Sequence, residues 1–271
     1  MAMSMSGYRK IAMLSAGFAF VLLSACSSGG DDGNAAAANE GDGGVASATS
    51  TLCSNVTGAE AIIWDIYNGV IRTDSVLPPP LPVGGGTFTH TATPLLGFFY
   101  PAGYNPTQIG VDLGTVGVDL IRDDLQVAWR QLQQTPVNNV TAGMLRDTEK
   151  DIWLTFFGLQ GTATQALCDN EGSVDAGGGI IRSFANTMFR VGDFTFLIAS
   201  SATALPGFPG QFSAFSKVVV APTSEFPERS IDTFLAIDWQ LLIGENSNLF
   251  DTDGDGVPDG IDAEPNNPNV S

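Results

Sequence analysis

The N-terminus of this chain limits which residues are left to fold. Arg9 and Lys10 precede an apolar run over residues 11–23, and the small residues Ser24 and Ala25 follow. A basic start, a short apolar run and small residues at its end are typical of a secretory signal peptide. The run holds about a dozen residues, whereas a helix that spans a bilayer needs roughly 20. We therefore expect residues 1–25 to be removed, so that the rest of the chain folds outside the cytoplasm.

The residues Leu23-Ser24-Ala25-Cys26 resemble the lipobox of bacterial lipoproteins. The resemblance implies cleavage before Cys26, a lipid on its thiol and acylation of its new amino group. In this family an Asp after the cysteine tends to hold the protein at the inner membrane, and here Ser27 stands there instead. The resemblance thus implies a lipid-anchored protein of the outer membrane. Both a periplasmic and a cell-surface orientation are compatible with it.

Composition divides the mature chain into three parts. Residues 27–50 contain no aromatic residue and a single Val, so residues 26–50 are predicted to be a lipidated, disordered tether. Its coil length is about 25–30 Å by square-root scaling. Residues 51–249 are predicted to form one globular domain, and residues 250–271 a separate C-terminal segment.

The charge of the chain restricts its partners. The formal net charge is −18, and loss of the basic leader makes the mature chain more acidic still. Such a chain repels nucleic acid and anionic surfaces and attracts divalent cations. The 44% hydrophobic content is enough for a substantial core. We therefore expect no nucleic-acid partner.

Cysteine usage predicts one disulfide. With Cys26 assigned to lipid by the resemblance above, Cys53 and Cys168 are the two cysteines left. Disulfides persist in oxidising compartments, so the prediction is a Cys53–Cys168 bond, with two buried free thiols as the alternative. The chain has no C-x-x-C motif and one histidine, His90, which excludes thiolate zinc sites and multi-histidine metal sites.

Apolar periodicity predicts three helices in the first part of the domain. Helical spacing runs over residues 59–72, where Thr57 and Glu60 match a capping box. A second helical stripe runs over residues 121–132 and ends before Pro136. A third covers residues 144–157, with Glu149 on its polar side.

Period-two alternation predicts strands, mainly in the second part of the domain. The predicted strands cover residues 87–93, 194–199, 215–220 and 235–243. Because helices come early and strands late, we expect an α+β fold in which N-terminal helices pack on an antiparallel sheet formed mainly by the C-terminal half. The alternative is a β-sandwich with helical insertions.

The segment over residues 251–262 has the ligand spacing of a calcium loop. Oxygen ligands at positions 1, 3, 5, 7, 9 and 12, with Gly at position 6, suit Ca²⁺. Gly256 provides the sharp turn. The predicted ligands are Asp251, Asp253, Asp255, the carbonyl of Val257, Asp259 and Asp262.

This segment also resembles the thrombospondin type 3 repeat, over Asp251 to about Asn269. The resemblance implies Ca²⁺ as a structural cofactor. Two departures stand out: Ala263-Glu264 replaces the Asn-Cys that often follows the last Asp, and a single repeat is visible where the family strings several together. The alternative is a solvated acidic tail that binds calcium weakly.

Catalytic constellations are sparse in this sequence. His90 is the one histidine that could serve a serine nucleophile, and no G-x-S-x-G motif is present. Gly84–Gly86 and Gly177–Gly179 lack the pattern of a phosphate-binding loop. A glycosidase would need paired carboxylates beside aromatic platforms. The candidates are Asp65 beside Trp64, Asp238 beside Trp239, and the group Asp119, Asp123 and Asp124.

The sequence therefore favours a non-catalytic role, and we assign no catalytic residue from it. The expected function is that of a lipid-anchored structural, adhesive or binding module at the cell envelope, with an envelope protein or a polysaccharide as its partner. The alternative is a hydrolase that acts through paired carboxylates on a polysaccharide-type substrate.

Overall fold

The computed structural model describes residues 49–70, 84–93 and 96–245, and within the last range it leaves out the side chains of residues 231, 232, 239 and 242–245. The predicted leader, the lipidation site Cys26 and the calcium loop over residues 251–262 lie outside the described residues.

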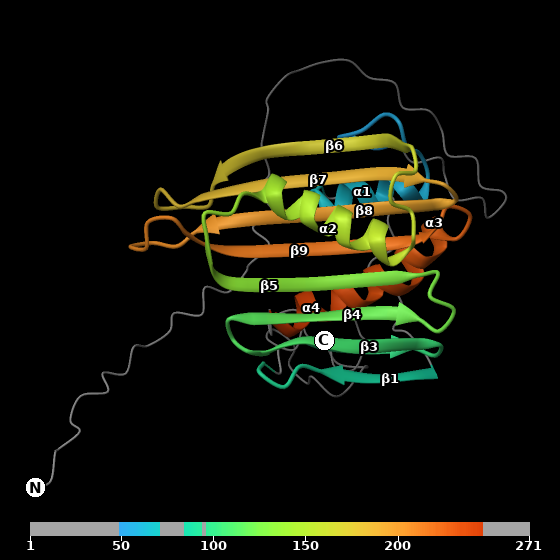
Figure 1. Cartoon of the computed structure of the whole chain (residues 1–271), viewed down its shortest axis with the longest axis horizontal. Coiled ribbons are helices and arrows are strands. Elements are labelled where there is room, and N and C mark those ends of the chain that lie inside the picture. The colour runs from blue at the N-terminus through green and yellow to red at the C-terminus, as the bar shows by residue number, and fades with distance from the viewer. Residues whose placement is uncertain (1–48, 71–83, 94–95, 246–271) are drawn as a thin grey trace, which may run out of the picture.

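A seven-stranded antiparallel sheet forms the centre of the described chain (Figure 1). Its strand order is β3-β4-β5-β9-β8-β7-β6, so one meander of three strands meets a second meander of four strands at the β5–β9 pair. The strands are β3 (Tyr104–Asp112), β4 (Thr115–Arg122), β5 (Ala128–Asn138), β6 (Thr164–Asp175), β7 (Ile181–Val191), β8 (Phe194–Ala204) and β9 (Gln211–Pro222).

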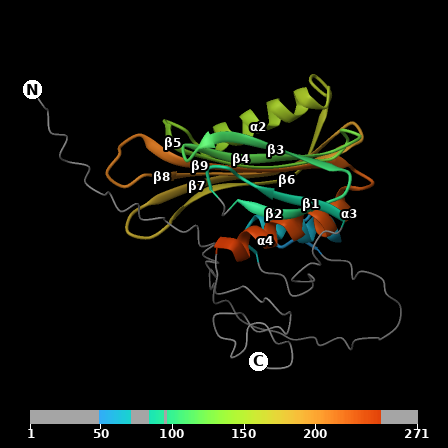
Figure 2. The ribbon, with the colours of Figure 1, turned by 90° about the horizontal axis from the view of Figure 1, so that it is seen from below.

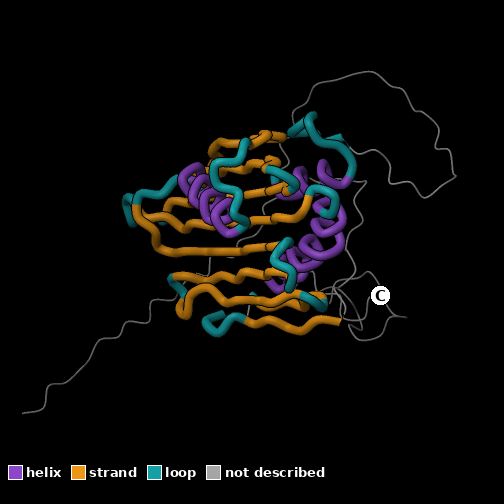
Figure 3. Tube along the Cα trace, turned by 45° about the vertical axis from the view of Figure 1, so that its right-hand side comes forward, coloured by secondary structure: helices purple, strands orange, loops and turns teal. Residues whose placement is uncertain are grey.

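Other elements cover both faces of this sheet, which gives three layers (Figure 2). Helix α2 (Ala142–Phe156) connects the two meanders and lies across one face. The opposite face carries helices and a two-stranded hairpin, and Figure 3 shows the helices of this layer gathered toward one end of the strands. The helices are α1 (Ala59–Tyr67), α3 (Phe226–Arg229), the π-helix η1 (Ser230–Leu235) and α4 (Ala236–Glu245). The hairpin consists of β1 (Gly84–Thr89) and β2 (Gly97–Pro101).

The central strands are apolar on both sides because both of their faces are covered. In β8, Leu197 packs in the core on the α1 side of the sheet and Ile198 in the core on the α2 side. In the adjacent strand β9, Val219 and Val218 divide between the two cores in the same way. Strands buried on two faces read as continuous apolar runs, and the predictions over residues 194–199 and 215–220 are confirmed.

Helix α2 covers most of the predicted span over residues 144–157 and begins two residues before it, at Ala142. The side-chain oxygen of Thr141 accepts a hydrogen bond from the backbone N–H of Met144 at 3.2 Å, which satisfies one unpaired donor of the first turn. The predicted face was partly wrong, because Glu149 is buried while Ile152 and Phe156 are exposed. The reason is that Glu149 finds an ion-pair partner in the sheet beneath it, described below.

The helix predicted over residues 121–132 is wrong. The segment is the end of β4, a tight turn with Leu125 at φ 58°, and the start of β5, and Ile121 pairs with Ala128 across the hairpin. Ala128 and Trp129 are adjacent and are both buried, one on each face of the sheet. Burial on both faces removed the alternation that would have indicated a strand.

The strand predicted over residues 235–243 is also wrong. Leu235 ends the π-helix η1, and the following residues form α4. The consecutive residues Phe234, Leu235, Ala236 and Ile237 are all buried. This helical run is enclosed on most sides, so its apolar residues do not form the single stripe of a surface helix.

The fold is thus sheet-rich and antiparallel, as expected, but its helices and strands are not divided between the halves of the chain. The first meander belongs to the half expected to be helical, and the described chain ends in helices. Within the described residues the sandwich alternative also fails, because helices and a short hairpin, and not a second large sheet, cover the α1 face. At α1 the predicted capping box is absent: Gly58 is the N-cap, and Glu60 pairs with Arg190.

Candidate functional site

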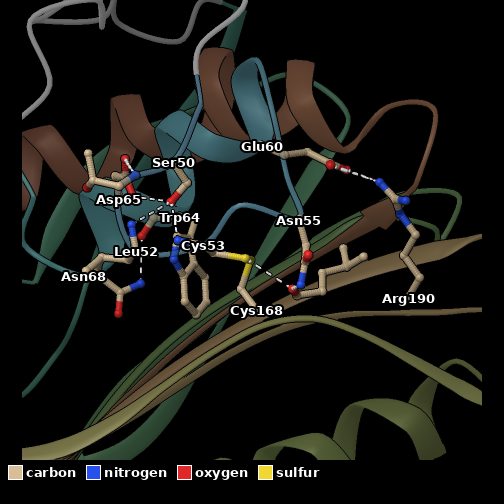
Figure 4. Close-up of a disulfide and its surroundings, with 12 residues drawn as sticks. Ser50, Leu52, Cys53, Asn55, Glu60, Trp64, Asp65, Asn68, Cys168 and Arg190 are labelled. Atoms are coloured by element: carbon tan, nitrogen blue, oxygen red, sulfur yellow. Dashed lines mark hydrogen bonds and ion pairs between the residues drawn. A yellow bond between two sulfur atoms is a disulfide. The ribbon is translucent and has the colours of Figure 1, made fainter.

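The predicted disulfide is present. Cys53, in the segment before α1, is bonded to Cys168 on the edge strand β6, with 5.6 Å between the two Cα atoms (Figure 4). Beside the bond, the amide of Asn55 donates a hydrogen bond to the carbonyl of Leu167 at 2.7 Å. The two links attach the start of the domain to the outermost strand of the sheet.

The first hydrolase candidate, Asp65, has a structural role close to this disulfide. Its buried carboxylate accepts hydrogen bonds from the hydroxyl of Ser50 at 2.6 Å and from the backbone N–H of Thr51 at 3.2 Å (Figure 4). Its neighbour Trp64 is fully buried in the core and is not an exposed sugar platform. Asp65 therefore holds the N-terminal segment against α1.

The second candidate, Asp238, belongs to a buried cluster on the α1 face, which we call the Lys217 cluster. The Nζ of Lys217 lies 2.7 Å from Oδ1 of Asp238, and the hydroxyl of Tyr67 donates to Oδ2 at 2.5 Å. Both charged side chains are only 12% exposed. The rings of Tyr67, Trp129 and Phe215 lie within 6.0 Å of the ammonium group, a range at which cation–π attraction contributes.

The Lys217 cluster ties three elements together: α1 supplies Tyr67, β9 supplies Lys217 and α4 supplies Asp238. Burial first, and then the neighbouring Asp238 carboxylate, raises the pKa of the Tyr67 phenol well above its ordinary value of 10. The phenol therefore remains a hydrogen-bond donor to Asp238 through the neutral range. A lysine bound to a carboxylate in this way is a fixed cation and not an available nucleophile.

A second ionic cluster lies on the opposite face of the same central strands, under α2, and we call it the Arg130 cluster. The guanidinium of Arg130 contacts Asp119 at 2.6 Å and Glu149 at 2.9 Å, and it lies 4.9 Å from the ring centre of Trp153. The hydroxyl of Ser216 donates to Glu149 at 2.7 Å. Both carboxylates are thus held by one buried cation, and neither is free to face a substrate.

The remaining carboxylates of the predicted acidic group lie in the exposed turn between β4 and β5. Asp123 accepts a hydrogen bond from Asn105 at 2.5 Å, and Asp124 forms an ion pair with Arg122 at 2.7 Å. Arg122 also pairs with Glu225. The hydrogen bonds from Arg122 lower the pKa of the Asp124 carboxyl group and that of the Glu225 carboxyl group. The group Asp119, Asp123 and Asp124 is therefore divided between a buried cluster and a surface turn.

His90 is buried and makes backbone contacts through both ring nitrogens. Its Nδ1 accepts a hydrogen bond from the N–H of Ala92 at 3.1 Å, so its Nε2 carries the proton and donates to the carbonyl of Ile109 at 3.0 Å. No nitrogen of the ring is left to take a proton from a serine. The histidine connects the β1 segment to β3.

The described surface includes two shallow hollows near candidate residues. One, of about 310 Å³, lies beside the disulfide and is lined by residues 52–55 and 166–169, with Asp169 as its one carboxylate. The other, of about 220 Å³, is lined by residues 84–87 with Phe99 and Tyr100. Neither hollow brings two of the predicted carboxylates together.

Two features are absent from the described part of the chain. No group of three or more His, Cys, Asp and Glu side chains in it could hold a metal ion. None of its helices is long and apolar enough to cross a bilayer.

Comparison with known proteins adds no family assignment. No protein-family model and no curated protein matches the chain. The functional argument therefore depends on its own residues.

Neither ionic cluster was predicted from the sequence, although one residue, Lys217, indicated a buried ion pair. Lys217 interrupts the apolar run of β9, between Phe215 and the three valines that follow. A charge in a strand that is buried on both faces must be paired, because an isolated buried charge is too costly. The lysine alone therefore implied a buried anion, but only the fold identifies it as Asp238.

Proposed function

We propose that this chain is a lipid-anchored protein of the cell envelope whose domain serves as a non-catalytic structural, adhesive or binding module, with Ca²⁺ bound by its C-terminal loop. The main support for a non-catalytic domain is that the candidate carboxylates are already engaged in contacts within the fold. Asp119 and Asp238 are paired with Arg130 and Lys217, and Asp65 accepts hydrogen bonds from the N-terminal segment. A glycosidase would need two carboxylates that face each other across a substrate.

The anchor is tested by replacing its lipidated residue. We expect the wild-type chain to incorporate labelled fatty acid and to float with membrane vesicles in a density gradient. The Cys26→Ser chain should lose both properties. A matched Cys53→Ser chain should keep the label, since that cysteine lies in the domain and takes no lipid. Equal labelling of the wild-type and Cys26→Ser chains would refute the anchor.

The calcium loop makes a separate thermodynamic prediction. A ligand that binds the native state tenfold above its dissociation constant contributes about 1.4 kcal/mol. For a domain of this size that corresponds to a rise of about 3–6 °C in Tm. We expect this rise between chelator and millimolar calcium, the affinity range of extracellular modules. Calorimetry in the two buffers measures it.

Asp255→Ala should remove most of this rise, because Asp255 is the predicted ligand at position 5 of the loop. Asp31→Ala, which removes an acidic residue from the predicted tether, is the control for a general effect of charge. If the melts in calcium and in chelator coincide for the wild-type chain, the loop does not stabilise the protein. If both variants reduce the rise equally, calcium acts on overall charge.

A further inference from the structure

Five exposed apolar side chains lie along one end of the seven-stranded sheet. The turns β3–β4, β6–β7 and β8–β9 all lie at this end because the strands are antiparallel, and in Figure 1 the last two project beyond the rest of the sheet. We call the exposed apolar residues in and beside these turns the tip row. It consists of Val111, Leu113, Val174, Ile181 and Phe208.

We propose that the tip row inserts into the surface of a zwitterionic lipid bilayer. The inference rests on the proposed lipid anchor for its membrane, but its residues belong to the folded domain. Phe208 is 59% exposed, and Val111 and Leu113 are 82% and 60% exposed. Large apolar side chains that project from turn tips gain free energy when they leave water.

The turn around Phe208 holds the ring outward in a fixed backbone. The N–H of Phe208 donates to the carbonyl of Leu205 at 3.1 Å, and its own carbonyl accepts from the N–H of Gln211 at 3.0 Å. Gly207 and Gly210 flank the ring with φ of 78° and 76°, values that glycine adopts without strain. The aromatic side chain is thus presented by a turn that needs no rearrangement.

The other two turns also pair backbone donors within the turn. The carboxylate of Asp112 accepts from the N–H of Gly114 at 2.8 Å, and that of Asp175 accepts from the N–H of Gly177 at 2.8 Å. Unpaired backbone donors are costly in an apolar medium, so internal pairing is a condition for entering a lipid interface. Each of the three turns meets this condition for some of its backbone donors.

The shape and charge of the tip row favour lipid over a protein partner. Its residues lie on three separate turns along the end of the sheet, and none of them lines either of the two hollows described above. Residues 111–115, 174–181 and 204–211 contain two Asp and no Lys or Arg. The absence of cations is unfavourable for an anionic membrane and compatible with a zwitterionic one.

The length of chain behind the anchor permits this contact. The stretch between Cys26 and Thr49 can span at most roughly 75 Å. The strand β8, with 11 residues, is about 36 Å long. Either end of the sheet can therefore reach the bilayer that holds the lipid.

The experiment places a fluorescent reporter at the tip row. The full chain with Phe208→Trp is mixed with excess phosphatidylcholine vesicles that contain brominated lipid, and tryptophan quenching is measured against the wild-type background. Phe156→Trp is the matched control, because Phe156 is 44% exposed and lies at the opposite end of the sheet, where α2 ends. We expect a shift to shorter wavelength and a loss of intensity for Phe208→Trp and not for Phe156→Trp.

The same measurement on the Cys26→Ser background separates this inference from the anchor. Without lipid the chain should still partition into vesicles, and Phe208→Asp should lower that partitioning by roughly tenfold. If the wild-type chain floats with membranes but Phe208→Trp is quenched no more than Phe156→Trp on either background, the tip row does not enter lipid while the anchor stands. A wavelength shift that depends on protein concentration and not on lipid would overturn the proposal in favour of self-association.

Discussion

Replacing Lys217 with Met is expected to lower the free energy of unfolding by about 3–5 kcal/mol, because it leaves the Asp238 carboxylate buried without its cation. Asp238 is 12% exposed, and its one other hydrogen-bond partner shown above is the Tyr67 hydroxyl. A loss of this size is a large part of the 5–15 kcal/mol that stabilises a typical domain. Urea unfolding of the two chains measures the difference.

The double variant Lys217→Met with Asp238→Leu is expected to recover most of the loss, because it removes both charges and leaves an apolar contact. Arg146→Met is the matched control, since the partners Asp147 and Glu171 of this arginine are 66% and 60% exposed. Exposed pairs of this kind contribute about 0–1 kcal/mol. A Lys217→Met cost no larger than that of Arg146→Met would contradict the importance of the buried pair.

Tyr67 adds a pH signature to the same cluster. Its pKa is raised in the folded chain, so above pH 10 the unfolded chain loses this proton while the folded chain keeps it. The contribution to stability is therefore complete below about pH 10 and is lost as the pH rises toward the folded-state pKa. The Tyr67→Phe chain should show a shallower decline in stability over this alkaline range.

The second large effect is expected at the disulfide. Replacing both Cys53 and Cys168 with Ala should lower the free energy of unfolding by about 4–5 kcal/mol, from the loop-entropy relation for a sequence separation of 115. The contact between the segment before α1 and strand β6 should survive in part, because Asn55 still donates to the carbonyl of Leu167. Denaturant unfolding with and without reductant tests both statements.

The slope of the denaturant curve identifies the mechanism. An unfolded chain without the cross-link exposes more surface, so the m value of the double variant should rise. Asn55→Ala, which removes the neighbouring hydrogen bond and keeps the disulfide, should lower stability with no change in m. If the reduced wild-type chain and the double variant unfold at different midpoints, the alanine side chains contribute an effect of their own.

Local chemistry made several features predictable. Thr141 caps α2 through its own side chain, and this capping depends only on residues within one turn. The pairing of Cys53 with Cys168 followed from cysteine number and compartment, once Cys26 was assigned to lipid. The strands β8 and β9 have apolar runs too short for a helix of ordinary length and rich in β-branched residues.

The candidate site was less predictable, because its members are distant in sequence. Lys217 and Asp238 are 21 residues apart, and Tyr67 is 171 residues from Asp238. The strand order that places β9 beside β5 brings the Lys217 cluster and the Arg130 cluster to opposite faces of the same strands. No periodicity in the chain encodes this order.

The sequence by itself indicated a helix over most of residues 144–157 and the apolar runs that enter the centre of the sheet, because these depend on neighbouring residues. It indicated the Cys53–Cys168 pair once the lipobox resemblance had assigned Cys26. Only the tertiary structure decided that residues 121–132 form a hairpin, that residues 236–245 form a helix and that Glu149 is buried. Apolar periodicity reports which faces of an element are covered, and that coverage exists only after distant segments have packed.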